Sequence, residues 1–217
     1  YPTIKIIKFT KKIAIANKES IICGWNLIEK KLKKHKTNFI PIDSEHFSIW
    51  KMLDNDKTDN VQKIVLTASG GPFLNKLNSN VANVKPHIAL KHPIWKMGKK
   101  ISIDSSTMMN KVFEYLEAKK IFNLKNKQLS ILIHPTSYVH ALILYRGGTI
   151  KFLAHKSKMS IPISNALNIH DKNYKNTILN HLPNLNKLKF MVPSKRKFPL
   201  LSILSIIPER SSYFETI

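Results

Sequence analysis

The sequence is poor in cysteine, glycine and long apolar runs, and these shortages exclude several classes of protein. The single cysteine, Cys23, excludes an internal disulfide framework and is typical of a reducing compartment. No apolar run approaches the roughly 18–20 residues of a membrane span, so we expect no membrane partner. The first residues, YPTIK, lack the apolar stretch of a signal peptide.

Acidic residues are also scarce. Asp and Glu number 13 against 36 Lys and Arg, which gives a formal net charge of +23. Such an excess is typical of proteins that bind nucleic acid or an anionic membrane surface. We favour biased composition instead, because the lysines are spread along the chain, Ile and Asn are abundant, and glycine numbers only 6. We therefore predict no nucleic-acid partner, and keep a basic phosphate- or nucleic-acid-binding module as the alternative.

Apolar patterns alternate between strands and helices over the first 133 residues. Short apolar runs and helical spacings predict strands at 13–16, 39–42, 63–68 and 129–133, and helices at 20–34, 46–53 and 106–122. The runs 141–145 and 149–154 flank Gly147-Gly148 and predict a hairpin. The alternation predicts an α/β fold. Beyond about residue 172, weak periodicity predicts a connector that leads to a short helix near 199–206.

Two acidic residues follow the second predicted strand. Asp43 and Glu45 are two positions apart, and in extended chain alternate side chains share a face. Two carboxylates aimed at one point suit Mg²⁺ or Mn²⁺. The alternative is an ordinary solvated loop.

The segment DSSTMMNKVFEYLE (104–117) carries a second group of polar residues. Asn110 and Glu114 are four positions apart, on one helical face, and Ser105 and Ser106 stand where an N-cap belongs. A helix start with hydroxyls, an amide and Lys111 can hold a phosphate. The alternative is a capped amphipathic helix with a solvated glutamate.

Two further places suggest ligand contacts, and a third does not. Ser69-Gly70-Gly71 ends a predicted strand, so its backbone can approach an anion, although an ordinary turn explains it too. His92, with Trp95 and Met97 nearby, lies in a loop-rich stretch that could form a lid, or a loop pinned to the core. His134 and His140 flank a turn at the wrong period for one helical face, and we do not predict them as ligands.

Five motifs occur in a fixed order, namely ANKES (16–20), PIDSEH (41–46), LTASGGPF (66–73), HPIWKMGKKISIDSSTMMNK (92–111) and ILIHPTSYVH (131–140). With them the chain resembles the 1-deoxy-D-xylulose-5-phosphate reductoisomerase family over most of residues 13–170. The resemblance implies an NADPH-dependent enzyme with a divalent cation (Mg²⁺, Mn²⁺ or Co²⁺). It would convert the phosphorylated sugar 1-deoxy-D-xylulose 5-phosphate to 2-C-methyl-D-erythritol 4-phosphate, in isoprenoid biosynthesis by the methylerythritol phosphate pathway. It also implies a homodimer in the bacterial cytoplasm, with a plastid as the alternative.

The resemblance further implies a role for each matching residue. It implies that the metal is held by Asp43, Glu45 and Glu114, and the substrate phosphate by Ser69, Ser105, Asn110 and Lys111. It implies that Lys18 and Ser44 hold the sugar backbone, that Lys18 and the three metal-binding carboxylates are catalytic, and that His92 and Trp95 belong to a flap. Positions near NADPH match Asn17, Glu19, Met97 and Gly98.

By the same resemblance the chain divides into three parts. Residues 1–42 are expected to end a Rossmann-like NADPH domain, 43–172 to form an α/β catalytic domain with a flap at about 70–98, and 173–217 to connect to a C-terminal helical domain. The Gly-rich nucleotide turn is absent from this sequence, so we expect the chain alone to bind NADPH weakly. Val112, Thr136 and Lys158 depart from the family's usual residues and keep a degenerate remnant open as an alternative.

Overall fold

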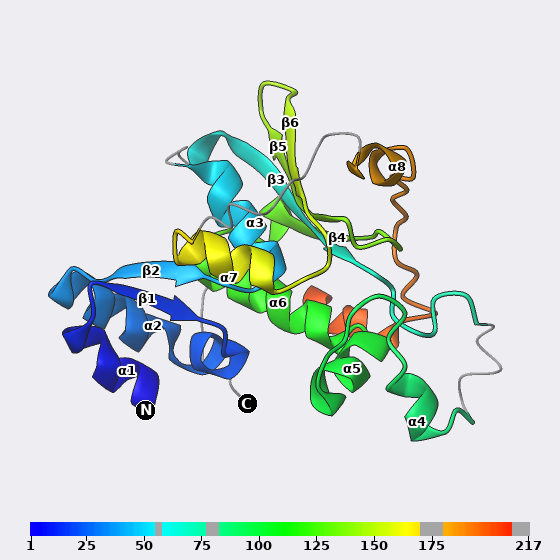
Figure 1. Cartoon of the computed structure of the whole chain (residues 1–217), viewed down its shortest axis with the longest axis horizontal. Helices are drawn as coiled ribbons and strands as arrows, with labels where there is room; N and C mark the ends of the chain where they lie inside the picture. Colours follow the sequence, from blue (N-terminus) through cyan, green and yellow to red (C-terminus); the bar gives the residue numbers. More distant parts are fainter. Residues whose placement is uncertain (55–57, 77–82, 170–179, 210–217) are drawn as a thin grey trace.

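The computed structural model describes residues 1–54, 58–76, 83–169 and 180–209 (Figure 1). Its strands are β1 (Lys12–Ile15), β2 (Asn38–Pro41), β3 (Val61–Ala68), β4 (Leu129–Ile133), β5 (Val139–Tyr145) and β6 (Ile150–Ala154). Its α-helices are α1 (Pro2–Ile6), α2 (Lys18–His35), α3 (Ser44–Leu53), α4 (Pro86–Ala89), α5 (Lys99–Ser106), α6 (Met109–Ile121), α7 (Ser160–Ala166) and α8 (Leu182–Leu185). Short 3-10 helices are η1 (Ile7–Phe9), η2 (Thr58–Asn60), η4 (Asn126–Gln128) and η6 (Pro199–Ser205). None of the described helices is both long and apolar enough to cross a membrane.

The N-terminal layer is a β–α–β unit. β1 and β2 pair in parallel, and α2 connects them. The Asn17 side chain caps α2 by accepting the Ser20 N–H at 2.7 Å, and α2 ends at Lys36 in a left-handed conformation. The apolar side of α2 packs on the preceding segment through a cluster of Ile7, Ile15, Ile21, Trp25, Ile28 and Leu32.

The second layer is a four-stranded sheet in the order β4-β3-β5-β6. β3 is parallel to β4 and antiparallel to β5, and β5 and β6 form the predicted hairpin. Ile64 and Leu66 of β3 are fully buried, as a central strand requires. α6 packs against α2 on one side and against β3 and β4 on the other, so it joins the two layers (Figure 1). The predicted α/β class is therefore correct, while the domain boundary at residue 42 stays a prediction.

Two predicted helices differ from the structure. The predicted helix 106–122 corresponds to α6, but its first residue, Ser106, ends the separate helix α5. The two helices are divided at Met108, whose φ of 65° lies in the left-handed region that residues with a Cβ disfavour. Ser105 and Ser106 therefore end α5, and the prediction that they cap the following helix is wrong. α3 begins at Ser44, two residues before the predicted start, because the Asp43 side chain accepts the Glu45 N–H as an N-cap.

The predicted connector and flap are described only in part. Met191 pairs with Ile133 at the end of β4, and η6, in the predicted helical segment, packs on α6. Residues 173–179 and 210–217 of the predicted connector, 170–172 at the end of the predicted catalytic domain, and 77–82 of the predicted flap lie outside the described residues.

Candidate active site

A cavity of about 260 Å³ opens where β3 ends, between the starts of α2 and α3 and the α5–α6 segment. Its lining includes most of the residues predicted from the sequence: Lys18, Asp43, Ser44, Glu45, Ser69, His92, Trp95, Met97, Ser105, Asn110, Lys111 and Glu114. Three predicted cofactor residues do not line it. Asn17 caps α2, Glu19 lies on the surface 3.3 Å from the Lys100 ammonium, and Gly98 precedes α5. The cofactor roles of these three residues stay predictions.

Three carboxylates meet at one wall of the cavity. Asp43, Glu45 and Glu114 each place an oxygen within 4.8 Å of the other two. Asp43 is the N-cap of α3, Glu45 lies in its first turn, and Glu114 projects from α6. The extended-chain argument for Asp43 and Glu45 is therefore wrong. The two side chains converge because a helix begins between them, and the side of α6 supplies the third carboxylate.

Two lysines, the partly buried Lys18 and the buried Lys111, balance these carboxylates. The Lys18 ammonium pairs with Asp43 and lies 3.6 Å from Glu114 Oε1. The Lys111 ammonium lies 2.7 Å from Glu45 Oε1 and also pairs with Glu114. Burial lowers the pKa of each lysine, but the facing carboxylates outweigh burial and raise it. The resemblance assigns Lys111 to the phosphate. In this structure its ammonium instead lies among the carboxylates and bridges Glu45 and Glu114.

Glu114 is the electrostatically strained member of the group. Burial, followed by the charge of Glu45, raises its pKa to about 7 against the opposing effect of Lys111 and Lys18. Its Oε2 forms an ion pair with the Lys111 ammonium and accepts no hydrogen bond among the described residues. Three carboxylates that converge in this way form an oxygen-rich set, which fits a hard divalent cation such as Mg²⁺ or Mn²⁺.

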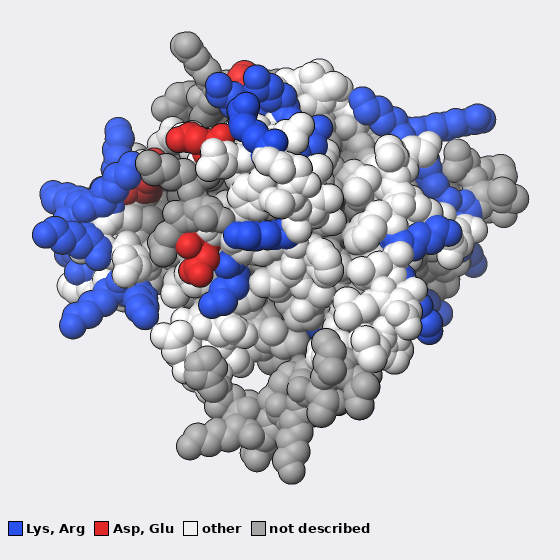
Figure 2. Space-filling view, turned by 90° about the horizontal axis from the view of Figure 1, so that it is seen from above, with Lys and Arg blue, Asp and Glu red and all other residues white. Residues whose placement is uncertain are grey.

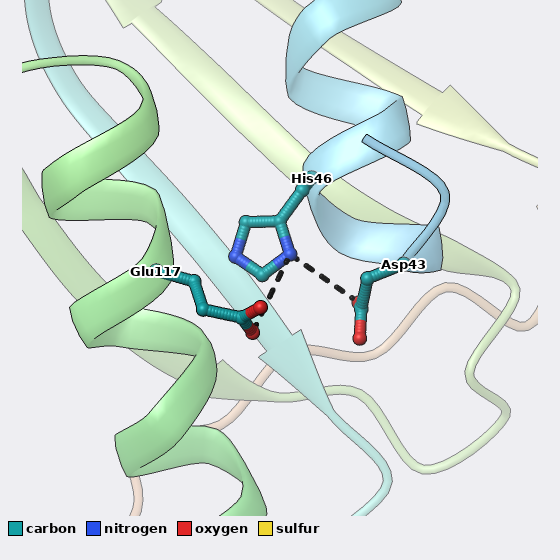
Figure 3. A group of neighbouring side chains, drawn as sticks. All are labelled: Asp43, His46 and Glu117. Carbon is teal, nitrogen blue, oxygen red and sulfur yellow. Dashed lines mark ion pairs between the residues drawn. The ribbon is translucent and has the colours of Figure 1, made fainter. Parts of the chain in front are cut away.

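Behind the three carboxylates lie two residues that sequence reasoning missed, His46 and Glu117. Figure 3 shows the His46 ring between Asp43 and Glu117, with one ring nitrogen facing both carboxylates. Glu117 Oε2 is also 3.3 Å from the Lys18 ammonium. Burial lowers the pKa of His46, but Glu117 and Asp43 raise it to about 9. Their spacing in the sequence could have indicated them. Glu117 follows Glu114 by three positions on one helical face, and His46 follows Asp43 by three.

The opposite wall of the cavity is built around Ser69. The Ile94 and Trp95 N–H groups both donate to His92 Nδ1, at 3.1 and 2.8 Å, so this nitrogen is an acceptor. Burial lowers the pKa of His92, which keeps the ring neutral and places its hydrogen on Nε2. That Nε2–H then donates to Ser69 Oγ at 2.9 Å, and the Gly71 N–H donates to the same oxygen at 3.1 Å. Ser69 therefore receives two hydrogen bonds and keeps its own O–H to donate to a ligand.

His140 adds a neutral ring to the cavity. It stacks on His155 with centroids 3.8 Å apart, and the Trp95 ring meets it edge-on at 6.0 Å. Its Nε2 donates to the His155 carbonyl at 3.2 Å. Burial and the neighbouring His155 lower the pKa of His140 to about 3. His134, by contrast, is fully buried away from the cavity, with Nδ1 2.9 Å from the Lys189 carbonyl.

The positive charge of the chain is dispersed. Figure 2 shows Lys and Arg in several separate groups around one face of the molecule, with uncharged surface between them. A second hollow, of about 680 Å³, is lined in part by Lys63, Lys125, Lys127 and Arg146, of which only Lys63 is partly buried. Exposed basic side chains of this kind are consistent with compositional bias.

Comparison with known protein families supports the resemblance. Residues 39–122 match the model of the 1-deoxy-D-xylulose 5-phosphate reductoisomerase C-terminal domain. The 1-deoxy-D-xylulose 5-phosphate reductoisomerase of Pelagibacter ubique (strain HTCC1062) is 56% identical over 217 residues, which is 100% of this chain and 56% of the relative. The enzyme of the same name from Wolbachia pipientis wMel is 45% identical over 203 residues, covering 93% of this chain and 52% of the relative.

Solved structures give the same result. A crystal structure of DOX-P reductoisomerase in complex with NADPH, fosmidomycin and magnesium matches with a TM-score of 0.84 and 37% identity, over 94% of this chain and 52% of that one. The 1-deoxy-D-xylulose 5-phosphate reductoisomerase from Zymomonas mobilis in complex with NADPH matches with a TM-score of 0.81 and 33% identity, over 93% of this chain and 52% of that one. The chain thus spans about half the length of the relatives it matches.

Proposed function

Because the chain belongs to the 1-deoxy-D-xylulose 5-phosphate reductoisomerase family, we propose that it forms the metal- and substrate-binding part of such an enzyme. The enzyme would rearrange 1-deoxy-D-xylulose 5-phosphate and reduce the product, with NADPH, to 2-C-methyl-D-erythritol 4-phosphate. Membership of the family also supports a homodimer in the bacterial cytoplasm, and both relatives named above are bacterial.

The proposed metal ligands are Asp43, Glu45 and Glu114, which would hold Mg²⁺, Mn²⁺ or Co²⁺. Such an ion polarises hydroxyl and carbonyl oxygens of a bound sugar as a Lewis acid. Lys18 keeps its proton because Asp43, Glu114 and Glu117 surround it, so it can donate a hydrogen bond to a substrate oxygen on which negative charge develops. Ser44, at the start of α3, offers a hydroxyl to the same part of the cavity.

The proposed phosphate site is the wall that carries Ser69 and Ser105. Ser69 Oγ accepts hydrogen bonds from His92 and Gly71. These two bonds orient its own O–H, which is free to donate to a phosphate. Lys111 shares its carboxylate partners with the proposed metal, so its ammonium is available to turn to the phosphate once those oxygens are engaged elsewhere. Asn110 now donates to Glu114 and can exchange partners in the same way.

The proposed flap covers this site. Trp95 and Met97 line the cavity as large apolar side chains and would exclude water from the reaction. Asn17, Glu19, Met97 and Gly98 are the proposed neighbours of NADPH, the hydride donor. Val112, one of the departures from the family pattern, is fully buried in the main core cluster, so its side chain does not obstruct the cavity. That placement favours a functional protein over the degenerate remnant.

The observation that carries the proposal is the convergence of Asp43, Glu45 and Glu114 on one cavity with Ser69 and Ser105. Its test is calorimetric titration of the chain with fosmidomycin, with and without Mn²⁺. We expect at least tenfold tighter binding with Mn²⁺, and none of this gain in Glu45→Gln. Equal affinity with and without the metal would contradict the proposal.

A further inference from the structure

His46 joins the two segments that carry the candidate metal ligands. It lies in α3 directly after Glu45 and is 0% exposed. Its Nε2 lies 2.8 Å from the main-chain oxygen of Glu114, which is 68 residues away in the sequence. A carbonyl oxygen only accepts, so Nε2 carries a hydrogen and donates it. The carbonyl has two lone pairs, and this bond adds to the helical hydrogen bond of α6 without replacing it.

The other ring nitrogen of His46 faces two carboxylates. Nδ1 is 3.5 Å from Asp43 Oδ1 and 3.9 Å from Glu117 Oε2 (Figure 3). Both are ion-pair distances, although Nδ1 makes no closer hydrogen bond among the described residues. The buried ring therefore has polar partners on both sides, the Glu114 carbonyl at Nε2 and the two carboxylates at Nδ1. The His46 ring thus contacts Asp43 and Glu114, two of the three candidate metal ligands.

We propose that His46 is a positioning residue, which holds Asp43 and Glu45 at a fixed distance from Glu114. This inference rests on the proposed function of those three carboxylates as metal ligands. The hydrogen bond from Nε2 fixes the main chain of Glu114, and thereby the position from which the Glu114 side chain extends. Metal ligands must be placed within a few tenths of an ångström, and loss of a supporting contact typically lowers metal affinity about 10–100-fold.

His46 could instead be a ligand, because Asp43, His46 and Glu117 also place ligand atoms within 4.8 Å of one another. An ion held by that second group would lie away from the cavity. Neither His46 nor Glu117 lines the cavity, whereas Asp43, Glu45 and Glu114 all do. The geometry therefore favours a support for one metal site over a second metal site.

Two amide variants separate the ring nitrogens of His46. A glutamine amide reaches the place of Nε2, whereas an asparagine amide reaches only the place of Nδ1. We expect His46→Gln to keep the Mn²⁺ affinity of the chain within about threefold, and His46→Asn and His46→Leu to lose about tenfold or more, by calorimetry. Electron paramagnetic resonance of bound Mn²⁺ should report altered ligand geometry in His46→Asn but not in His46→Gln.

His134→Leu is the matched control, because His134 is equally buried and its ring also bonds a main-chain carbonyl, that of Lys189. It should lower the melting temperature as His46→Leu does and leave Mn²⁺ affinity unchanged. Equal losses in His46→Gln and His46→Asn, or none in either, would overturn the positioning role. So would a second Mn²⁺ ion per chain that disappears with His46.

Glu45→Gln distinguishes the two proposals. Weakened Mn²⁺ binding in Glu45→Gln, with unchanged binding in His46→Asn, overturns the role of His46 alone. Retained Mn²⁺ affinity in Glu45→Gln overturns the proposed metal site, and the positioning role with it.

Discussion

Gly71 packs directly against the main chain of Ser105. A Cβ at Gly71 would lie 2.8 Å from the Ser105 carbonyl oxygen, and its φ of 63° is in the left-handed region. This contact brings the turn after β3 against the end of α5, so Ser69 and Ser105 share one wall of the cavity. A loop and a helix far apart in sequence thereby form one candidate phosphate site.

Gly71→Ala should therefore separate the two serines. We expect a loss of about 1–3 kcal/mol in the free energy of unfolding, from strain, and at least a tenfold loss of fosmidomycin affinity, from misplaced donors. Chemical denaturation and calorimetry measure the two effects. Gly148→Ala is the control, because Gly148 has a φ of 81° but open space around it, in the distant β5–β6 turn. It should destabilise without changing ligand affinity, and equal affinity losses in both variants would contradict the argument.

The orientation of Ser69 by His92 gives a second prediction. Ser69→Ala and His92→Ala should each weaken fosmidomycin by about tenfold, since the first removes a donor and the second frees it to point elsewhere. His92→Gln should recover part of the loss, because its amide can donate to Ser69 Oγ. If the double variant loses as much as the two single variants added together, the two residues act independently and the hydrogen bond of 2.9 Å does not couple them.

Lys111 and Glu114 should have separable effects although they are paired. Lys111→Ala should weaken the phosphonate-bearing ligand by about tenfold to a hundredfold, through loss of a charge-assisted hydrogen bond. It should leave Mn²⁺ binding as strong or stronger, because the Lys111 ammonium competes for the oxygens of Glu45 and Glu114. Glu114→Gln should mainly weaken Mn²⁺. Titration of each variant with Mn²⁺ alone, and then with fosmidomycin, measures the two effects separately. The same metal-dependent loss in both variants would contradict separate roles for Lys111 at the phosphate and Glu114 at the metal.

The buried ring of His140 predicts an acid-labile fold. Its folded pKa is about 3, below the unfolded value of about 6.5, so the unfolded chain binds more protons between these values. The stability that neutral His140 contributes is fully present above pH 6.5 and is lost as pH falls towards 3, with a slope of up to about 1.4 kcal/mol per pH unit. His140→Phe should flatten this dependence in denaturation experiments between pH 7.5 and 5. An unchanged slope would show that His140 is already protonated in the folded state.

Much of the fold and most of the cavity lining follow from local sequence. The strands 12–15, 61–68 and 129–133 and the β5–β6 hairpin are short apolar runs with clear ends, so they lie within one or two residues of where periodicity predicts them. The motifs around Asp43, Ser69 and Asn110 identify the family, and through it twelve residues that line the cavity. These features depend on neighbours along the chain or on a specific order of residues, and both are visible without coordinates.

Tertiary packing alone decided the rest. The break between α5 and α6 requires Met108 in a conformation that its own propensity disfavours, and only its burial in the core selects it. Asp43 aims at Glu114 because it caps α3, whose position is set by contacts with β5, β6 and α6. His46 and Glu117 read as ordinary helical residues until α3 and α6 are brought together. Lys111 pairs with Glu114, three positions along α6, and with Glu45, which is 66 residues away and which only the packing of α3 beside α6 brings close.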